Sequence, residues 1–154
     1  MKTTAGIFLI NKKGQILIGH PTNHPKWFWS IPKGEFVEKN DPFEEALREL
    51  EEETNIKINK DIKYHTLSPT VYKSKKKTLY SFSIFESENN IDLSKFNLKC
   101  NSFFEFKGKM VPEFDQIEWI NIKESIDLVH ESQKENLKHI YSSYQFSMSH
   151  YLST

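Results

Sequence analysis

Several residue types that define particular protein classes are scarce in this chain. Cys100 is the only cysteine among 154 residues, which excludes an internal disulfide and a thiolate zinc site and favours a reducing compartment such as the cytoplasm. Charge of one sign is also lacking, because 21 basic and 21 acidic residues cancel. No overall field therefore favours nucleic acid or an anionic membrane, and charge-dependent functions must come from local clusters.

Long apolar runs are absent as well. The N-terminal run, residues 5–10, is soon followed by lysines and is too short for a signal peptide or a membrane span. We therefore expect a cytoplasmic protein with no membrane anchor. A hydrophobic content of 37 % and an aromatic content of 14 % nevertheless place the chain outside disordered composition. Its length predicts one folded domain over residues 1–154.

The alternation of apolar runs and turn-forming residues predicts the strands. Two aliphatic runs, AGIFLI and QILIG, flank a polar turn that ends in Gly14, and together they predict a β-hairpin. Residues 20–32 contain three prolines and predict a loop that leads into a short strand at 29–31 and a turn at 32–34. Further strands are predicted at residues 64–72, 78–86, 102–106 and 118–120.

Two helices are predicted between and after these strands. Asp41 is a typical N-cap residue, and it is followed by a proline at the first helical position and by Glu44 three residues later. This helix should end near Thr54, where Asn55 can adopt the left-handed conformation that terminates a helix. A second helix is predicted over residues 122–144. Strands interleaved with two helices predict an α+β fold, arranged as an α/β/α sandwich.

The first helix carries six glutamates within residues 44–53. At about 100° per residue its apolar residues form one stripe that must face the core. Glu49, Glu52 and Glu53 fall together beside that stripe, where their i, i+3, i+4 spacing stacks three carboxylates on one face. Their mutual repulsion calls for a counter-charge. A hard divalent cation such as Mg²⁺ or Mn²⁺, which prefers oxygen ligands, supplies one.

An acidic helix that merely faces solvent is the alternative interpretation. Two features argue against it. The acids border the apolar stripe instead of lying opposite to it, and Arg48 on the same helix is the only arginine among 21 basic residues. A guanidinium can hold carboxylates or backbone carbonyls in a fixed geometry, which a lysine ammonium cannot do. We therefore interpret Arg48 as an architectural residue of a metal-binding helix.

Residues 34–56, GEFVEKNDPFEEALRELEEETNI, resemble the signature of the Nudix hydrolases. That pattern is Gly, five residues, Glu, seven residues, then Arg-Glu-aliphatic-any-Glu-Glu-any-Gly-aliphatic. The matching positions are Gly34, Arg48, Glu49, Leu50, Glu52, Glu53 and Ile56. Asn40 stands where the first glutamate is expected, which removes a carboxylate near the metal region, although Glu38 or Asp41 could substitute. Asn55 replaces the late glycine and can preserve the helix-ending turn.

The resemblance extends beyond this signature. WSIPKGEF and NSFFEFKGKMVPEFDQIEWI are similar to a branch of nucleoside-polyphosphate pyrophosphohydrolases of this length. The Pro-Lys-Gly entry is also similar to Nudix enzymes that act on diadenosine polyphosphates and inositol pyrophosphates. The resemblance implies an α/β/α sandwich with a mixed sheet. It also implies a reaction in which water attacks phosphorus and a nucleotide or phosphate leaves.

The resemblance also implies roles for individual residues. Two or three metal ions, Mg²⁺ or Mn²⁺, would be held by Glu49, Glu52 and Glu53, with the Gly34 carbonyl as a possible further ligand. Glu49 or Glu53 would double as the catalytic base, and Arg48 would hold the loop and the glutamates. Lys33, directly before the signature, is predicted to contact a substrate phosphate. A merely solvated lysine is the alternative.

A lysine-rich segment between two predicted strands is a second candidate for substrate binding. Lys73 and Lys75–Lys77 could grip a phosphate or simply keep a hairpin turn soluble. We expect Lys75, together with Tyr72 and Lys33, to bind the substrate. The aromatic candidates for stacking on a base, worth about 1–3 kcal/mol in nucleotide sites, are Trp27, Phe28, Tyr64 and Tyr72, although most aromatic residues belong to a core.

Two further groups carry weaker signals. His20 and His24 are four residues apart, but the prolines that follow each of them exclude a helix, so a zinc pair is disfavoured. Asp115 and Glu118 flank a predicted strand and could add an acid to the cleft, or they could lie on an exposed edge.

Three functions are compatible with these residues. The first is a pyrophosphohydrolase for dinucleoside polyphosphates of the diadenosine tetraphosphate type or for nucleoside triphosphates. The second is an RNA 5′-end pyrophosphohydrolase with the lysine-rich segment guiding the strand, which strong salt dependence would reveal. The third is a catalytically weak module that binds a nucleotide as a sensor, an interpretation kept open by Asn40. Substrate identity depends on loops outside the signature.

Overall fold

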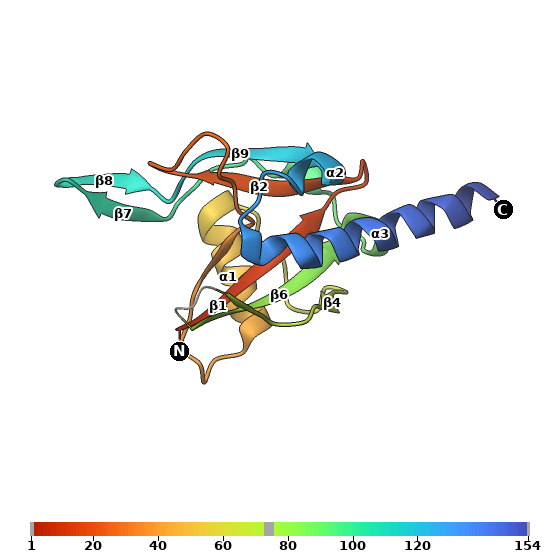
Figure 1. The fold of residues 1–154 in the computed structure, drawn as a ribbon, viewed down its shortest axis with the longest axis horizontal. Helices are drawn as coiled ribbons and strands as arrows, with labels where there is room; N and C mark the ends of the chain where they lie inside the picture. The colour runs from red at the N-terminus through yellow and green to blue at the C-terminus, as the bar shows by residue number, and fades with distance from the viewer. Residues whose placement is uncertain (1, 73–75, 154) are drawn as a thin grey trace.

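The computed structural model describes residues 2–72 and 76–153, with the side chains of the last helix described as far as residue 145. Figure 1 shows the arrangement of the helices and strands. The elements are β1 (Lys2–Ile10), β2 (Gln15–Pro21), β3 (Lys33–Glu35), α1 (Pro42–Thr54), β4 (His65–Thr66), β5 (Thr70–Tyr72), β6 (Lys77–Phe85), the 3₁₀ turns η1 (Glu86–Glu88) and η2 (Leu93–Lys95), β7 (Phe103–Phe106), β8 (Lys109–Pro112), β9 (Phe114–Asn121), α2 (Ile122–Ser125) and α3 (Glu131–Ser153).

Seven of the strands form one mixed sheet. Its main path runs β4-β6-β1-β2-β9, with β3 paired to β1 and β5 paired to β6. Strands β1 and β6 are parallel along their whole length, from Lys2 opposite Lys77 to Ile10 opposite Phe85, and the other pairs are antiparallel. The mixed sheet expected from the sequence is therefore confirmed.

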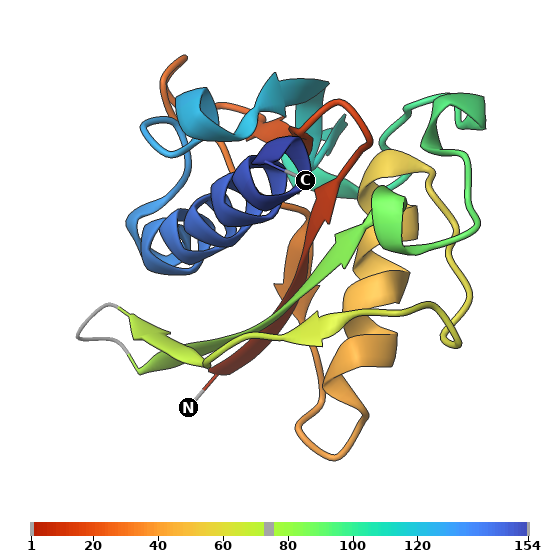
Figure 2. The same ribbon diagram turned by 90° about the vertical axis from the view of Figure 1, so that its right-hand side faces the viewer.

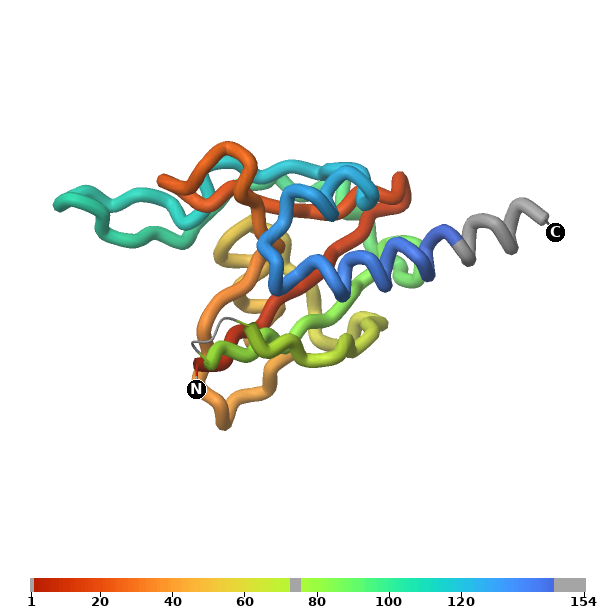
Figure 3. Tube along the Cα trace, in the orientation of Figure 1, coloured from red at the N-terminus to blue at the C-terminus, as the bar shows by residue number. Residues whose placement is uncertain are grey.

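The predicted N-terminal hairpin exists but opens soon after its turn. β1 and β2 pair at Ile10 and Ile16, next to Gly14, whose φ of 75° suits the turn. Nearer its start, at residues 4–6, β1 pairs with β3 instead, while β2 pairs with β9 along its whole length. β3 also contacts α1, and Figure 3 traces the chain from β2 through residues 22–32 down to β3.

Helices cover both faces of the sheet. Alternate residues of β1 point to opposite sides, so Ile7 and Leu9 pack with α1 in one buried cluster and Phe8 and Ile10 pack with α3 in another. Figure 2 shows α1 and α3 on opposite sides of the strands. The α+β class and the α/β/α sandwich are confirmed. Among the described residues, no helix is both long enough and apolar enough to span a membrane.

Helix α1 has the bounds that its sequence predicts. The Asp41 carboxylate accepts a hydrogen bond from the Glu44 N–H at 2.9 Å, and Pro42 occupies the first turn. Asn55 ends the helix in the left-handed conformation with φ 72°, and its N–H donates to the Glu51 carbonyl. Both ends are thus fixed by local capping, which makes the helix a firm support for its acidic residues.

The predicted second helix is interrupted. Its first turn is α2, and α3 begins only at Glu131. In between, Leu128 accepts a hydrogen bond from the Trp29 N–H, and the His130 N–H donates to the Trp29 carbonyl. The segment is extended because it pairs with Trp29, a long-range contact that the local sequence does not encode.

Some predicted strands also differ from the observed ones. The segment expected at 64–72 is divided into β4 and β5, with Pro69 between them. Trp29 and Ser30 form isolated bridges, and the strand lies at β3, where a turn was expected. The strand expected at 118–120 is the longer β9. The strand at 102–106 belongs to a separate hairpin, β7–β8, which projects from the main sheet (Figure 1).

Candidate active site

The second half of α1 presents the acidic residues. Glu49 and Glu53, one turn apart, are 8 % and 6 % exposed, and they lie beside the apolar stripe that includes Leu50. The side chain of Glu52 is 40 % exposed. Two carboxylates are thus drawn into the protein by the same packing that buries the stripe, while the third stays at the surface.

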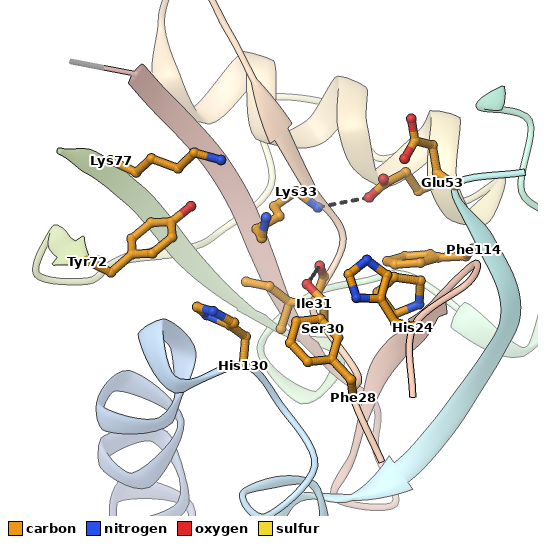
Figure 4. A pocket seen from close by; sticks show the side chains of 12 residues that line it. His24, Phe28, Ser30, Ile31, Lys33, Glu53, Tyr72, Lys77, Phe114 and His130 are labelled. Carbon is orange, nitrogen blue, oxygen red and sulfur yellow. Dashed lines mark hydrogen bonds between the residues drawn. The ribbon is translucent and has the colours of Figure 1, made fainter. Parts of the chain in front are cut away.

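Strand β3 lies directly against these carboxylates. The Lys33 backbone N–H donates to Glu53 Oε1 at 2.9 Å, as the dashed line in Figure 4 shows. A Cβ atom on Gly34 would lie 2.1 Å from the carboxyl carbon of Glu49 and 2.3 Å from both of its oxygens. Only glycine leaves room for the Glu49 carboxylate to rest on the β3 backbone. The structure therefore brings together Lys33, Gly34, Glu49 and Glu53.

Arg48 organises the carboxylates on the open side of the helix. Its guanidinium donates to Glu45 Oε2 at 3.0 and 2.7 Å, to Glu49 Oε1 at 3.0 Å, and also to Glu52. Burial lowers the pKa of Arg48, but the hydrogen bonds that its guanidinium donates to Glu45 and Glu52 outweigh burial and raise the pKa above its usual value. Asn40 joins the same network, since its side-chain N–H donates to Glu45 at 3.0 Å.

The positive charge near Glu49 and Glu53 is too small to offset the burial of their carboxylates. Burial raises the pKa of Glu53 well above its usual value, the neighbouring Glu49 raises it further, and the Lys33 N–H only partly offsets this. Burial also raises the pKa of Glu49, with Arg48 opposing the shift. Such a pair ionises more readily when a cation is added, so its electrostatics suit a metal site.

A cavity of about 420 Å³ opens beside Glu53 (Figure 4). One wall is charged and contains Glu53, Glu113, Lys33 and Lys77. The other wall is formed by aromatic and imidazole rings. They are His24, Phe28, Tyr72, Phe114 and His130. A polar end next to carboxylates and an aromatic end suit a ligand that carries both phosphates and a flat ring.

The aromatic wall consists of rings in mutual contact. His24 stacks on Phe28 with ring centroids 4.7 Å apart and planes 19° apart. The His130 ring lies edge-on to both Phe28 and Tyr72, at 5.6 Å from each. These rings come from loop 22–28, from β5 and from the residue before α3, and α1 contributes Glu53 to the same pocket.

Some of the residues that the sequence suggested for substrate binding line the cavity, and others do not. Lys33 and Tyr72 line the cavity, as does Lys77, whereas Lys73 and Lys75 lie outside the described residues. Tyr64 stacks on the core residue Phe43 at 3.7 Å. Trp27 is 68 % exposed, and its ring lies edge-on to Phe28. Of the aromatic candidates, Phe28 and Tyr72 are the ones in the cavity wall.

Sequence reasoning missed four residues of the cavity walls, Glu113, Phe114, His24 and His130. Glu113 supplies the extra acid, and burial raises its pKa, while Lys33 opposes the shift. Of the acids proposed for this role, Asp115 pairs with His20 and Glu118 is exposed. His24 and His130 belong to the aromatic wall. A glutamate between a proline and a phenylalanine at the start of a strand is the only local signal for Glu113, and it is not specific.

The donor atoms fit a hard divalent cation. Glu49 and Glu53 offer buried carboxylate oxygens, and the missing side chain at Gly34 lets the Glu49 carboxylate lie against the β3 backbone. Carboxylate and carbonyl oxygens are the ligands preferred by Mg²⁺ and Mn²⁺. Among the described residues, no group of three or more acidic, histidine or cysteine side chains lies close enough together to hold a metal ion. Arg48 instead donates hydrogen bonds to Glu49 and Glu52.

Comparison with known proteins places these features in one family. The NUDIX domain family model matches residues 1–142. An RNA pyrophosphohydrolase of Pelagibacter ubique is 28 % identical over 131 residues, covering 84 % of this chain and 82 % of the relative. An RNA pyrophosphohydrolase of Cereibacter sphaeroides is 47 % identical over 51 residues, but that match covers only 33 % of this chain and 32 % of the relative.

Solved structures agree on the fold. The binary complex of a C. elegans Ap4A hydrolase superposes with a TM-score of 0.63 at 21 % identity, covering 96 % of this chain and 99 % of that one. A signature on β3 and α1, a matching sandwich and a family match over nearly the whole chain lead to one conclusion. This chain belongs to the NUDIX family and is a Nudix hydrolase, an enzyme that acts on phosphorus-containing acid anhydrides.

Proposed function

We propose that this enzyme is a metal-dependent pyrophosphohydrolase that cleaves a diphosphate linkage in a nucleotide, either a dinucleoside polyphosphate of the diadenosine tetraphosphate type or a nucleoside triphosphate. The observation that carries the proposal is the cavity of about 420 Å³ that joins the buried Glu53 carboxylate, two lysines and an aromatic wall. A polyphosphate next to the acids and lysines would place its base among the rings.

The acidic end would hold the metal ions. Glu49, Glu52 and Glu53 are the carboxylate ligands that we assign to Mg²⁺ or Mn²⁺, with the Gly34 carbonyl as a further donor. When bound, such ions neutralise phosphate oxygens and lower the pKa of the attacking water. Arg48 positions these ligands through its hydrogen bonds to Glu49 and Glu52, and we do not assign it to the substrate.

The chain's own residues supply the remaining roles. Lys33 and Lys77 line the charged wall and would bind the phosphates as point charges. Glu53 is our first choice for the general base, because its carboxylate lines the cavity and would lie beside a metal-bound water. Glu49 is the second choice. Phe28 and Tyr72 would stack on the base.

A second candidate substrate is the 5′ end of RNA. The names of the relatives from Pelagibacter ubique and Cereibacter sphaeroides favour it. A triphosphate at an RNA 5′ end offers the same phosphates and base to the same cavity. The two substrates differ in what continues beyond the first nucleotide, so binding to RNA should weaken steeply with salt and binding to a free nucleotide should weaken less.

The deciding experiment measures phosphate and nucleotide release from diadenosine polyphosphates, nucleoside triphosphates, nucleotide sugars and 5′-triphosphate RNA, with Mg²⁺ or Mn²⁺. The Glu53→Gln variant is measured beside Glu51→Gln, an exposed glutamate on the same helix. We expect turnover of one substrate class that needs metal, falls by about 10²-fold or more in Glu53→Gln, and persists in Glu51→Gln. Binding without turnover across all metals would reject the enzyme proposal in favour of a nucleotide sensor.

A further inference from the structure

His20, near the end of β2, is a buried histidine that lies outside the residues assigned to catalysis. The residue is 8 % exposed, and its ring nitrogens are engaged on both sides. Nδ1 lies 2.7 Å from Asp115 Oδ1, and Nε2 lies 2.9 Å from the Pro25 carbonyl oxygen. The edge of the Trp29 ring closes the remaining side, with centroids 5.5 Å apart. One buried imidazole thus joins β2, β9 and loop 22–28.

A β-bulge brings the carboxylate to His20. His20 pairs with Gln116, but the next residue, Pro21, pairs with Phe114. Asp115 is therefore the extra residue on β9, and a bulge of this kind turns a side chain away from its regular alternation. The bulge lies directly after Glu113, at the edge of the cavity, so the contact is built into the same end of the sheet as the site.

The two partners determine the protonation of His20. A backbone carbonyl can only accept a hydrogen bond, and so can an ionised carboxylate. Each ring nitrogen must carry a proton to satisfy its partner, so the geometry requires an imidazolium. Burial lowers the pKa of His20, but the hydrogen bonds that its ring donates to Pro25 and Asp115, with a smaller contribution from the backbone of His24, outweigh it and raise the pKa above 6.5.

The Pro25 carbonyl connects this imidazolium to the substrate cavity. The same oxygen accepts the Phe28 N–H at 2.9 Å, and Phe28 stacks on His24 in the cavity wall. The other end of the loop is held at Thr22, whose N–H donates to the Glu113 carbonyl at 3.1 Å. His20 therefore braces the middle of the loop at Pro25.

We propose that His20, protonated and clamped between Asp115 and Pro25, is a positioning residue that fixes the His24–Phe28 wall, so that nucleotide binding weakens when His20 loses its proton. The part concerning nucleotide binding depends on the function proposed above. Neutral His20 can donate to only one partner. If it keeps its bond to Asp115, a ring lone pair faces the Pro25 oxygen, and the loop loses its brace.

The charged group that faces His20 from β9 is Asp115, and loop 22–28 presents backbone oxygens to it. Because the folded-state pKa is raised, the clamp is fully formed below pH 6.5 and is lost as the pH rises through that raised value. Binding through the phosphates and metal ligands on α1 and β3 does not involve His20. The effect should therefore fall on KM more than on kcat.

The first measurement is a pH titration of the protein labelled with ¹⁵N at histidine, which reads the protonation of each ring nitrogen without any substrate. We expect both nitrogens of His20 to be protonated at pH 6.5 and one to lose its proton at higher pH, together with shifts of the backbone amides of loop 22–28. A ring that carries one proton at pH 6.5 would overturn the proposal, whatever the enzyme hydrolyses.

The second measurement is the pH profile of KM and kcat for the nucleotide that the wild type hydrolyses. KM should rise by about tenfold as His20 deprotonates, and in Asp115→Asn the rise should move to lower pH. His20→Gln should show the raised KM at all pH values. The matched control is His65→Gln, which removes another histidine–carboxylate pair, His65–Glu88 at 2.7 Å, and should leave the profile unchanged.

Asp115→Asn and His20→Gln together control for misfolding of one variant and for ionisation of the substrate. Ionisation of the substrate phosphates is the same in wild type and Asp115→Asn, so a displacement between their profiles belongs to His20. Asp115 has a 41 % exposed side chain, which makes its variant usable if His20→Gln does not fold. Identical profiles for wild type and Asp115→Asn would overturn the positioning role. Absence of any turnover would refute the proposed function and leave the ¹⁵N titration to decide the clamp.

Discussion

Replacing Gly34 with alanine tests the central contact of the site. The added Cβ would lie 2.3 Å from the two carboxylate oxygens of Glu49, whereas ordinary contacts with carbon are about 3.5 Å. The obstructing atoms are the far end of a flexible side chain, so Glu49 can rotate away without disturbing the fold. The carboxylate would then move by about 1 Å.

The displacement sets the size of the expected loss. A misplacement of about 1 Å in a catalytic constellation can cost on the order of 10²-fold in rate, which corresponds to about 2.7 kcal/mol of transition-state stabilisation. The loss should appear in kcat, because Lys33, Lys77 and the aromatic wall still bind the substrate. The free energy of unfolding should change by less than about 1 kcal/mol, since the core around Leu50 is not touched.

The assay compares kcat and KM of wild type and Gly34→Ala at saturating Mg²⁺, with the thermal unfolding midpoint of each. Gly108→Ala is the matched control, because a Cβ there meets nothing within 4 Å; its φ of 79° costs some stability but should leave kcat unchanged. A Gly34→Ala enzyme with kcat within threefold of wild type would refute the argument. So would a loss of activity that merely follows a loss of folded protein.

Three further changes have expected outcomes. Arg48→Lys should lower kcat by about tenfold with little change in the unfolding midpoint, because an ammonium cannot reproduce the guanidinium contacts to Glu45, Glu49 and Glu52; unchanged kinetics would exclude a positioning role. Leu50→Ala, which empties a fully buried position, should cost about 2–5 kcal/mol in denaturant unfolding. Wild-type stability should fall as the pH rises from 6.5 through the raised pKa of His20, and this slope should vanish in His20→Gln.

The acidic half of the site could be predicted because its signals are local. A capping aspartate, a proline and a helical period place Glu49 and Glu53 on one face of α1 without any tertiary information. The sequence also identified the region of Gly34. What it could not give was the distance between β3 and α1, which depends on β3 pairing with β1 rather than on residues 33–35 themselves.

Of the aromatic wall, the sequence named Phe28 and Tyr72 as candidates but not the histidines that join them. His24, Tyr72 and His130 come from three separate segments and meet only after the sheet has formed. The break before α3 shows the same effect, since the local sequence favours a continuous helix and pairing with Trp29 overrides it. Contacts between distant segments therefore assemble the aromatic wall of the cavity, and local sequence patterns place the acidic residues on α1.

Asn40 illustrates how a departure from the family pattern can be absorbed. Its side-chain N–H donates to Glu45, and Glu45 in turn accepts two hydrogen bonds from Arg48. A glutamate at position 40 would face the Glu45 carboxylate with a like charge, whereas an amide can donate to it. Asn40 thus contributes to the clamp on Arg48, next to the acids, while Glu49 and Glu53 remain held by the sheet. In this structure Asn40 is linked to the acids that we propose as metal ligands through Glu45 and Arg48.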